Sequence, residues 1–148
     1  MIACRRSALR TGAAALLACA FGVKPAFAGS YLNRAALLLH QARREGEYLR
    51  PRYGDKELAR IVHEVARARL QAASGMMVPK EVVQAHPHLL LVLENYERAA
   101  EAAINLMPEK FLLALQRAQD EERTFRVVMK QLGWDIPSVH KDDDGPNR

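Results

Sequence analysis

The chain has 148 residues, 49% of them hydrophobic, and its 22 Lys and Arg against 17 Asp and Glu give a net charge of +5. This length suits one domain that buries its own core. The two cysteines, Cys4 and Cys19, both precede the segment expected to fold, which excludes a disulfide scaffold and a thiolate metal site.

The N-terminus has the features of an export signal. Arg5 and Arg6 begin a basic region, an apolar run follows over residues 11–23, and Ala26-Phe27-Ala28 fits the small-residue pattern that precedes cleavage. A helix that spans a bilayer needs about 20 apolar residues, so this run is too short for a permanent anchor. We therefore expect cleavage after Ala28.

The basic region resembles the twin-arginine export motif. Arg5-Arg6-Ser7-Ala8-Leu9-Arg10 has Ala where that motif usually has Phe, and ends in Arg where it usually has Lys. Lys24 places a positive charge before the cleavage site, which in such signals discourages use of the general secretory channel. The resemblance implies export of a folded protein into a bacterial periplasm.

A second processing route is less favoured. Leu16-Leu17-Ala18-Cys19 loosely resembles a lipobox, in which the cysteine is lipidated and starts the mature chain. The apolar run before Cys19 would be only eight residues long. We therefore do not expect a lipid anchor at Cys19.

Removal of the signal peptide, residues 1–28, changes the charge balance. It leaves 18 basic against 17 acidic residues, because four of the 22 basic residues lie in the leader. The high basicity thus belongs largely to the leader and does not indicate nucleic-acid binding, which usually shows as a basic patch on the folded domain.

Apolar residues at helical spacing predict two helices in the first half of the mature chain. Ser30 can cap the first helix, which ends before Pro51. Asp55 caps the second helix, and Ser74-Gly75 closes it, because glycine readily takes the left-handed conformation at a helix end.

A third helix is predicted over residues 86–107, and the other helices must cover its apolar face. Pro87 supports its start and leaves His86 at the N-cap. The linker over residues 76–85 contains Pro79, which suggests a short helical crossover into this helix.

A fourth helix opens after Pro108, runs from Glu109 to about Leu132 and ends at Gly133. Trp134 is expected to fold back over this end. A single kinked helix in place of the third and fourth helices is the alternative.

Four helices with short connections and no strand-like alternation predict an all-α fold, an antiparallel four-helix bundle with a short crossover helix. We assign the bundle to residues 29–134 and a polar, disordered tail to residues 135–148.

Arg69 is a charged residue near the centre of the second helix's apolar face. If the second and fourth helices run in the same direction, Glu121 and Glu122 lie level with it, and Asn95 can reach the same layer. We predict a buried polar layer of these residues, favoured as a structural pair that fixes helix register. The alternatives are a ligand site in which Arg69 holds an anionic group, and an Arg69 side chain that extends to water.

His86, His88, Met76 and Met77 form a second candidate site. Imidazole and thioether groups suit copper or haem iron. Residues two apart project about 200° apart on a helix, so only an irregular helix start could bring both histidines to one ion. The favoured interpretation is that His86 caps the helix and the methionines fill the bundle end.

A basic cluster lies near the C-terminal end of the first helix, where it complements the helix dipole. Contact with an anionic lipid or an acidic partner is the alternative role for these residues, which are Arg43, Arg44, Arg50, Arg52 and Lys56.

The sequence contains no enzyme signature. It lacks Glu-x-x-His, Cys-x-x-Cys-His, His-Glu-x-x-His, Gly-x-Ser-x-Gly and a glycine-rich phosphate loop. We therefore expect no catalysis, but a small exported bundle of the bacterial cell envelope that acts by binding, as an interaction or accessory protein with an envelope protein partner. The alternative is a periplasmic copper or haem carrier with His and Met ligands.

Overall fold

The computed structural model describes residues 26–139, and no strand occurs among them. The prediction of an all-helical chain with four helices is confirmed. These helices are α1 (Ala26–Leu49), α2 (Lys56–Ser74), α3 (His86–Ile104) and α4 (Pro108–Gln131), and 3-10 helices connect them at Arg50–Arg52 and Lys80–Val82.

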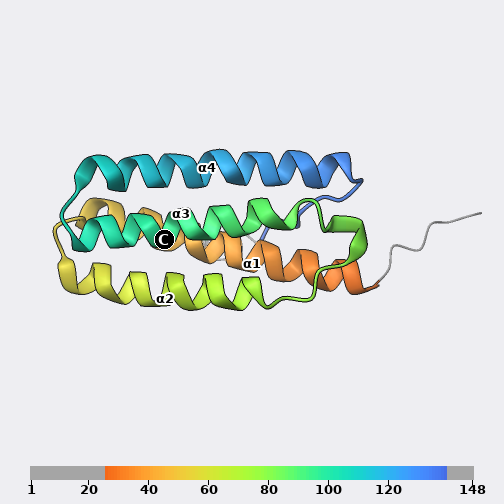
Figure 1. The fold of residues 1–148 in the computed structure, drawn as a ribbon, viewed down its shortest axis with the longest axis horizontal. Coiled ribbons are helices and arrows are strands. Elements are labelled where there is room, and N and C mark those ends of the chain that lie inside the picture. Colours follow the sequence, from red (N-terminus) through yellow and green to blue (C-terminus); the bar gives the residue numbers. More distant parts are fainter. Residues whose placement is uncertain (1–25, 140–148) are drawn as a thin grey trace, which may run out of the picture.

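The helices form a bundle in which α3 is central. They lie along the long axis, and the chain reverses direction at each connection (Figure 1). α3 contacts all three other helices, most extensively α4 and α2. Because it is covered from several sides, α3 buries more than one stripe of residues, including Leu89, Val92, Leu93, Tyr96, Ala99, Ala100 and Ala103.

Small residues set the distance between α1 and α3. Gly46 of α1 is buried, and a Cβ at this position would lie 2.8 Å from Cε1 of Tyr96. The missing side chain therefore allows the Tyr96 ring to lie against the α1 backbone. This contact places an aromatic side chain of the central helix beside α1.

Two of the predicted helix caps are confirmed, and a third has a different conformation. The Asp55 carboxylate accepts a backbone N–H of the first turn of α2 at 2.9 Å, which confirms the predicted cap. Gly133 is left-handed with φ of 83°, as predicted. Trp134 folds back, also as predicted, and its backbone N–H donates to the Met129 carbonyl. Gly75 has φ of −89°, so the prediction of a left-handed residue there is wrong.

Two helix starts differ from their predicted positions. α1 begins at Ala26, so Ser30 lies inside the helix instead of capping it. His86 is the first residue of α3, and the N-cap is Ala85, which has no capping side chain. Ala85 already has helical angles, with φ of −83° and ψ of −27°, because the chain enters α3 directly from the 3-10 helix.

α3 and α4 are separate helices, and α3 ends at Ile104 instead of at Met107. Leu106 is left-handed with φ of 52°, and the Met107 N–H returns to the Ala102 carbonyl at 2.9 Å. This bond closes the helix end in the manner that usually uses glycine. A leucine in this conformation costs about 1 kcal/mol, and Pro108 then starts α4.

The predicted leader falls mostly outside the described residues, as do Arg5, Arg6, Lys24 and Cys19. Ala28, its expected last residue, lies in the first turn of α1 and is buried. Among the described helices, none has the length and apolar character that a membrane crossing requires.

The chain after α4 turns back along the bundle (Figure 1). Ile136 packs against the hydrophobic core, and residues 136–139 line a hollow together with α1 and α4. The first part of the segment that was predicted to be a disordered tail thus contacts the bundle.

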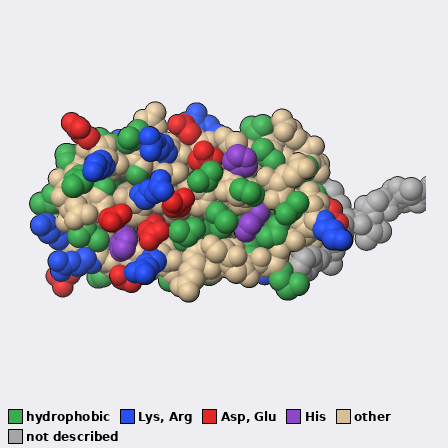
Figure 2. All heavy atoms as spheres, in the orientation of Figure 1, with side chains coloured by type: hydrophobic (Ala, Val, Ile, Leu, Met, Phe, Trp, Pro, Cys, Tyr) green, Lys and Arg blue, Asp and Glu red, His purple; other side chains and the backbone are tan. Residues whose placement is uncertain are grey.

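Charge is unevenly distributed over the bundle. Figure 2 shows Lys, Arg, Asp and Glu side chains intermixed over one half of the face that α2, α3 and α4 present, with mostly apolar and neutral side chains toward the α2–α3 connection. Between Arg69 and Glu94, the only charged residues are Lys80 and Glu81.

Candidate binding groove

Two groups of buried charges tie α1 to its neighbours. Glu122 of α4 accepts hydrogen bonds from Nη2 of Arg43 and Nη2 of Arg126, both at 2.8 Å. Arg69 of α2 donates to Oε1 of Glu45 at 2.5 Å. Because Arg43 and Glu45 are two residues apart, they project from opposite flanks of α1. α1 is therefore fastened to α4 on one side and to α2 on the other.

These bonds divide the predicted polar layer. Arg69, Asn95 and Glu122 are all buried, but Arg69 pairs with Glu45 instead of with a glutamate of α4. Asn95 donates to the Leu91 carbonyl of its own helix at 2.8 Å. The prediction placed α2 opposite α4, whereas α3 has its most extensive contacts with these two helices and α2 also contacts α1. The position of Arg69 along the bundle axis was therefore not sufficient to identify its ion-pair partner.

The two histidines of the predicted metal site contact different helices. His86 Nδ1 lies 3.1 Å from the hydroxyl of Tyr31 on α1. His88 Nδ1 lies 3.1 Å from Oε2 of Glu121 on α4, which accounts for the second glutamate of the predicted layer. Burial lowers the pKa of His86, so its imidazole is neutral at neutral pH.

The two methionines of that site also differ in environment. Met76 packs against the hydrophobic core, whereas Met77 is 69% exposed. Within residues 26–139, no group of three or more His, Cys, Asp or Glu side chains is placed to hold a metal ion.

A groove runs between α1 and α4, with Tyr96 of α3 as its floor. It contains a cavity of about 260 Å³. Residues one helical turn apart on α1 face residues one turn apart on α4. We call this feature the α1–α4 groove, and its lining consists of Arg43, Gly46, Glu47, Arg50, Tyr96, Leu112, Leu115, Gln116 and Gln119.

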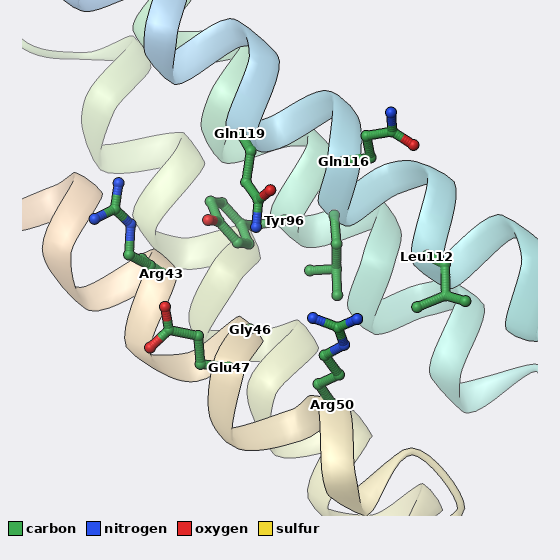
Figure 3. A pocket seen from close by; sticks show the side chains of 9 residues that line it. Arg43, Gly46, Glu47, Arg50, Tyr96, Leu112, Gln116 and Gln119 are labelled. Carbon is green, nitrogen blue, oxygen red and sulfur yellow. The ribbon is translucent and has the colours of Figure 1, made fainter.

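Several polar side chains of the groove gather around Tyr96, whereas Gln116 points away from it (Figure 3). Figure 3 shows Arg43 and Glu47 on the same side of α1, with the Tyr96 hydroxyl directed toward Arg43. Gln119 reaches from α4 toward the Tyr96 ring, and the Arg50 guanidinium extends into the space between the two helices (Figure 3).

Burial, and next the negative charge of Glu122, raise the pKa of Tyr96 to about 12. The hydroxyl is therefore protonated at neutral pH and can donate a hydrogen bond. Burial alone would lower the pKa of Arg43, but the hydrogen bond and charge of Glu122, with Tyr96 and Glu47, raise it above its ordinary value.

The groove and its ion pair have one excess positive charge. The cations are Arg43, Arg50 and Arg126, and the anions are Glu47 and Glu122. Arg43 and Arg126 share Glu122, whereas the Arg50 side chain has no ion-pair partner among the residues that the structure describes.

The bundle has two further hollows. One of about 200 Å³ lies beyond the Arg43–Glu122 pair and is lined in part by residues 136–139. The other, of about 510 Å³, lies between α3 and α4, and its cations are Arg98, Lys110 and Arg117. Unlike the α1–α4 groove, this larger hollow has no buried aromatic side chain in its lining.

The sequence pattern predicted Arg43 and Arg50 only as part of a basic helix end. No pattern indicated a role for Glu45, Gly46 or Gln119. The one signal that could have located the groove was Gly46, because a glycine in the interior of a predicted helix indicates a close approach by another element.

Searches with this chain against protein-family models, curated proteins and solved structures found no match.

Proposed function

We propose that this chain is a small exported protein of the bacterial cell envelope that acts by binding, and that the α1–α4 groove is its binding site. The groove supports this proposal because it combines a cavity, a buried tyrosine hydroxyl and an unpaired guanidinium from Arg50. Binding sites in helical bundles are commonly built from side chains on facing helices. In this proposal, an antiparallel four-helix bundle holds those side chains rigidly.

A photocrosslinking amino acid tests where the partner binds. Placed at Gln119, which points to the Tyr96 ring, it should form an adduct in a periplasmic or envelope fraction. The matched control is Arg117, which projects from the opposite flank of α4 and lines the α3–α4 hollow. Equal adducts at both positions, or none at Gln119, would reject the groove as the binding site.

We also propose that residues 1–28 direct export by the twin-arginine route and are then removed, which would place the mature chain in the periplasm. The arginine pair and the small-residue pattern before Gly29 support this. Replacement of Arg5 and Arg6 by Lys should abolish export in a cell-fractionation assay. Undiminished export of this variant would exclude the twin-arginine route, and N-terminal sequencing of the exported chain would locate the cleavage site.

The alternative function, a copper or haem carrier, has less support because His86 and His88 contact different helices. A titration of the exported protein with copper or haem, followed by absorption spectroscopy, tests it. Stoichiometric binding that is lost in His88→Ala would favour the carrier over the groove-binding function.

A further inference from the structure

On the basis of the proposed function, we infer that the α1–α4 groove binds a small organic ligand with one negative charge and an apolar part. Its anionic group would pair with Arg50, and its apolar part would cover Leu112 and Leu115. This ligand class includes amphiphilic carboxylates and sulfonates.

The charges of the groove indicate a single negative charge on the ligand. Arg43 donates to Glu122 at 2.8 Å, and the negative charge of Glu47 also acts on it. Arg126 donates to the same carboxylate. Of the three cations counted at the groove, only Arg50 lacks an ion-pair partner within residues 26–139, so one anionic group balances the net charge of +1. A second negative charge on the ligand would have no cation left to pair with.

The walls of the groove indicate an apolar part. Leu112 is 49% exposed, and the partly buried Leu115 lies next to it along the same face of α4. Gly46 on the opposite wall has no side chain and is already buried against Tyr96 and Leu115. A ligand that covers the exposed parts of the two leucines removes apolar surface from water, which contributes about 25 cal/mol for each Å².

The size and the hydrogen-bonding groups further define the ligand. Small-molecule pockets usually have at least about 300 Å³, and this cavity has about 260 Å³. The ligand is therefore no larger than a compact ring system or a short acyl chain. The protonated Tyr96 hydroxyl offers a hydrogen-bond donor, and the Gln119 amide offers both a donor and an acceptor.

Two dyes with the same aromatic rings test the charge requirement. Anilinonaphthalene sulfonate carries one negative charge, and N-phenylnaphthylamine carries none. We expect the exported protein to bind the sulfonate at one site about tenfold more tightly than the neutral dye, measured by fluorescence titration. Octanoate should displace the sulfonate, because a carboxylate has the same charge. Equal affinity for the two dyes, or no displacement by octanoate, would overturn the inference.

Single substitutions test the location. Arg50→Gln should weaken sulfonate binding about tenfold. Two control changes should leave it unchanged: Arg44→Gln, an exposed change on α1 outside the groove lining, and Arg117→Gln, in the α3–α4 hollow. Circular dichroism establishes that each variant is folded. A loss in Arg117→Gln, or equal effects of Arg44→Gln and Arg50→Gln, would contradict the assignment to Arg50.

The two proposals fail in different ways. If Gln119 forms no adduct in the envelope fraction, the groove is not the binding site of a natural partner, whatever dyes it accepts. If Gln119 forms an adduct but the two dyes bind equally, the groove binds a partner without the predicted charge preference, and only the further inference fails.

Discussion

The two ion-pair groups that fasten α1 differ in which partner is buried. In the α1–α2 pair the cation is buried, since the Arg69 side chain is 5% exposed and the Glu45 side chain 30%. In the α1–α4 group the anion is buried, since the Glu122 side chain is 3% exposed, whereas those of Arg43 and Arg126 are 49% and 45% exposed.

This difference indicates what each group does. Arg69 has a single charged partner, so the α1–α2 pair is neutral, although Oε2 of Glu45 is buried without a hydrogen-bond partner within residues 26–139. Glu122 has two half-exposed partners, and one of them, Arg43, also lines the α1–α4 groove. The second group can therefore contribute to a binding site without leaving a buried charge unpaired.

The largest expected effect is the removal of both arginines around Glu122. Arg43→Met with Arg126→Met leaves a buried carboxylate alone and should lower the free energy of unfolding by about 4 kcal/mol. Each single change should cost only about 1 kcal/mol, because the other arginine remains. Urea unfolding measures all three variants, with the exposed pair Arg44→Met and Arg123→Met as the control. Additive single effects would show that the two arginines do not substitute for each other.

The next largest effect tests the asymmetry of the α1–α2 pair. Glu45→Ala leaves Arg69 buried without its partner and should cost about 3 kcal/mol in the free energy of unfolding. Arg69→Met should cost less, about 2 kcal/mol, because the Glu45 side chain left behind is 30% exposed, even though its Oε2 atom is buried. Glu47→Ala, on the exposed side of α1, is the matched control. If Arg69→Met lowers the free energy of unfolding more than Glu45→Ala does, the exposed fractions of the two side chains do not determine the cost of breaking the pair.

The stability at alkaline pH gives a further test of the α1–α4 group, because burial and also the negative charge of Glu122 raise the pKa of Tyr96. Its pKa is raised by burial, and next by Glu122, from 10.0 to about 12. Between these two pH values the folded state keeps the Tyr96 proton, whereas the unfolded chain loses it. The contribution of Tyr96 to the free energy of unfolding is therefore fully present below about pH 10, and it falls by about 2 kcal/mol as the pH rises to about 12. Tyr96→Phe should remove this part of the loss, as measured by urea unfolding across that range.

A second measurement separates Tyr96 from Tyr31, whose pKa burial also raises to about 12 without a contribution from Glu122. Glu122→Gln should lower the titration midpoint of Tyr96 only, as followed by ultraviolet difference absorbance. A shift of both tyrosines would indicate a general loss of packing instead of a local charge effect.

The smallest expected effect is the response to salt. The half-exposed arginines around Glu122 are accessible to ions, whereas Arg69 is not. At an ionic strength near 1 M, where the screening length is about 3 Å, the cost of Arg43→Met should shrink by a few tenths of a kcal/mol. The cost of Glu45→Ala should stay constant. Equal salt dependence of the two costs would argue against the difference in burial.

Much of the fold was predictable because it depends on local chemistry. The Asp55 cap, the left-handed Gly133 with Trp134 folded back, and the helix start at Pro108 are each determined by a few neighbouring residues. The end of α3 was not predicted, because Leu106 takes a left-handed conformation that leucine ordinarily avoids. The short turn from Ile104 to Pro108 imposes it.

The candidate site was less predictable than the fold. Burial of Arg69 on an apolar face followed from spacing, but its partner did not, because helical periodicity does not specify which helix lies alongside. Gln119 gave no signal at all, since a glutamine on an exposed helix face is common. Tyr96 lies within the predicted third helix, and only its close contact with Gly46 and its place in the cavity lining show that it forms the floor of a groove.

The sequence by itself determined that residues 29–134 contain four helices and which side of each helix avoids water, since capping, proline and glycine placement and apolar spacing act over a few residues. Only the tertiary structure decided that Glu45 pairs with Arg69, that Arg43 and Arg126 share Glu122, and that Arg50 and Tyr96 border one groove. The physical reason is that these contacts depend on the order of helices around α3 and on their rotation about their own axes. The packing of all side chains together sets both quantities.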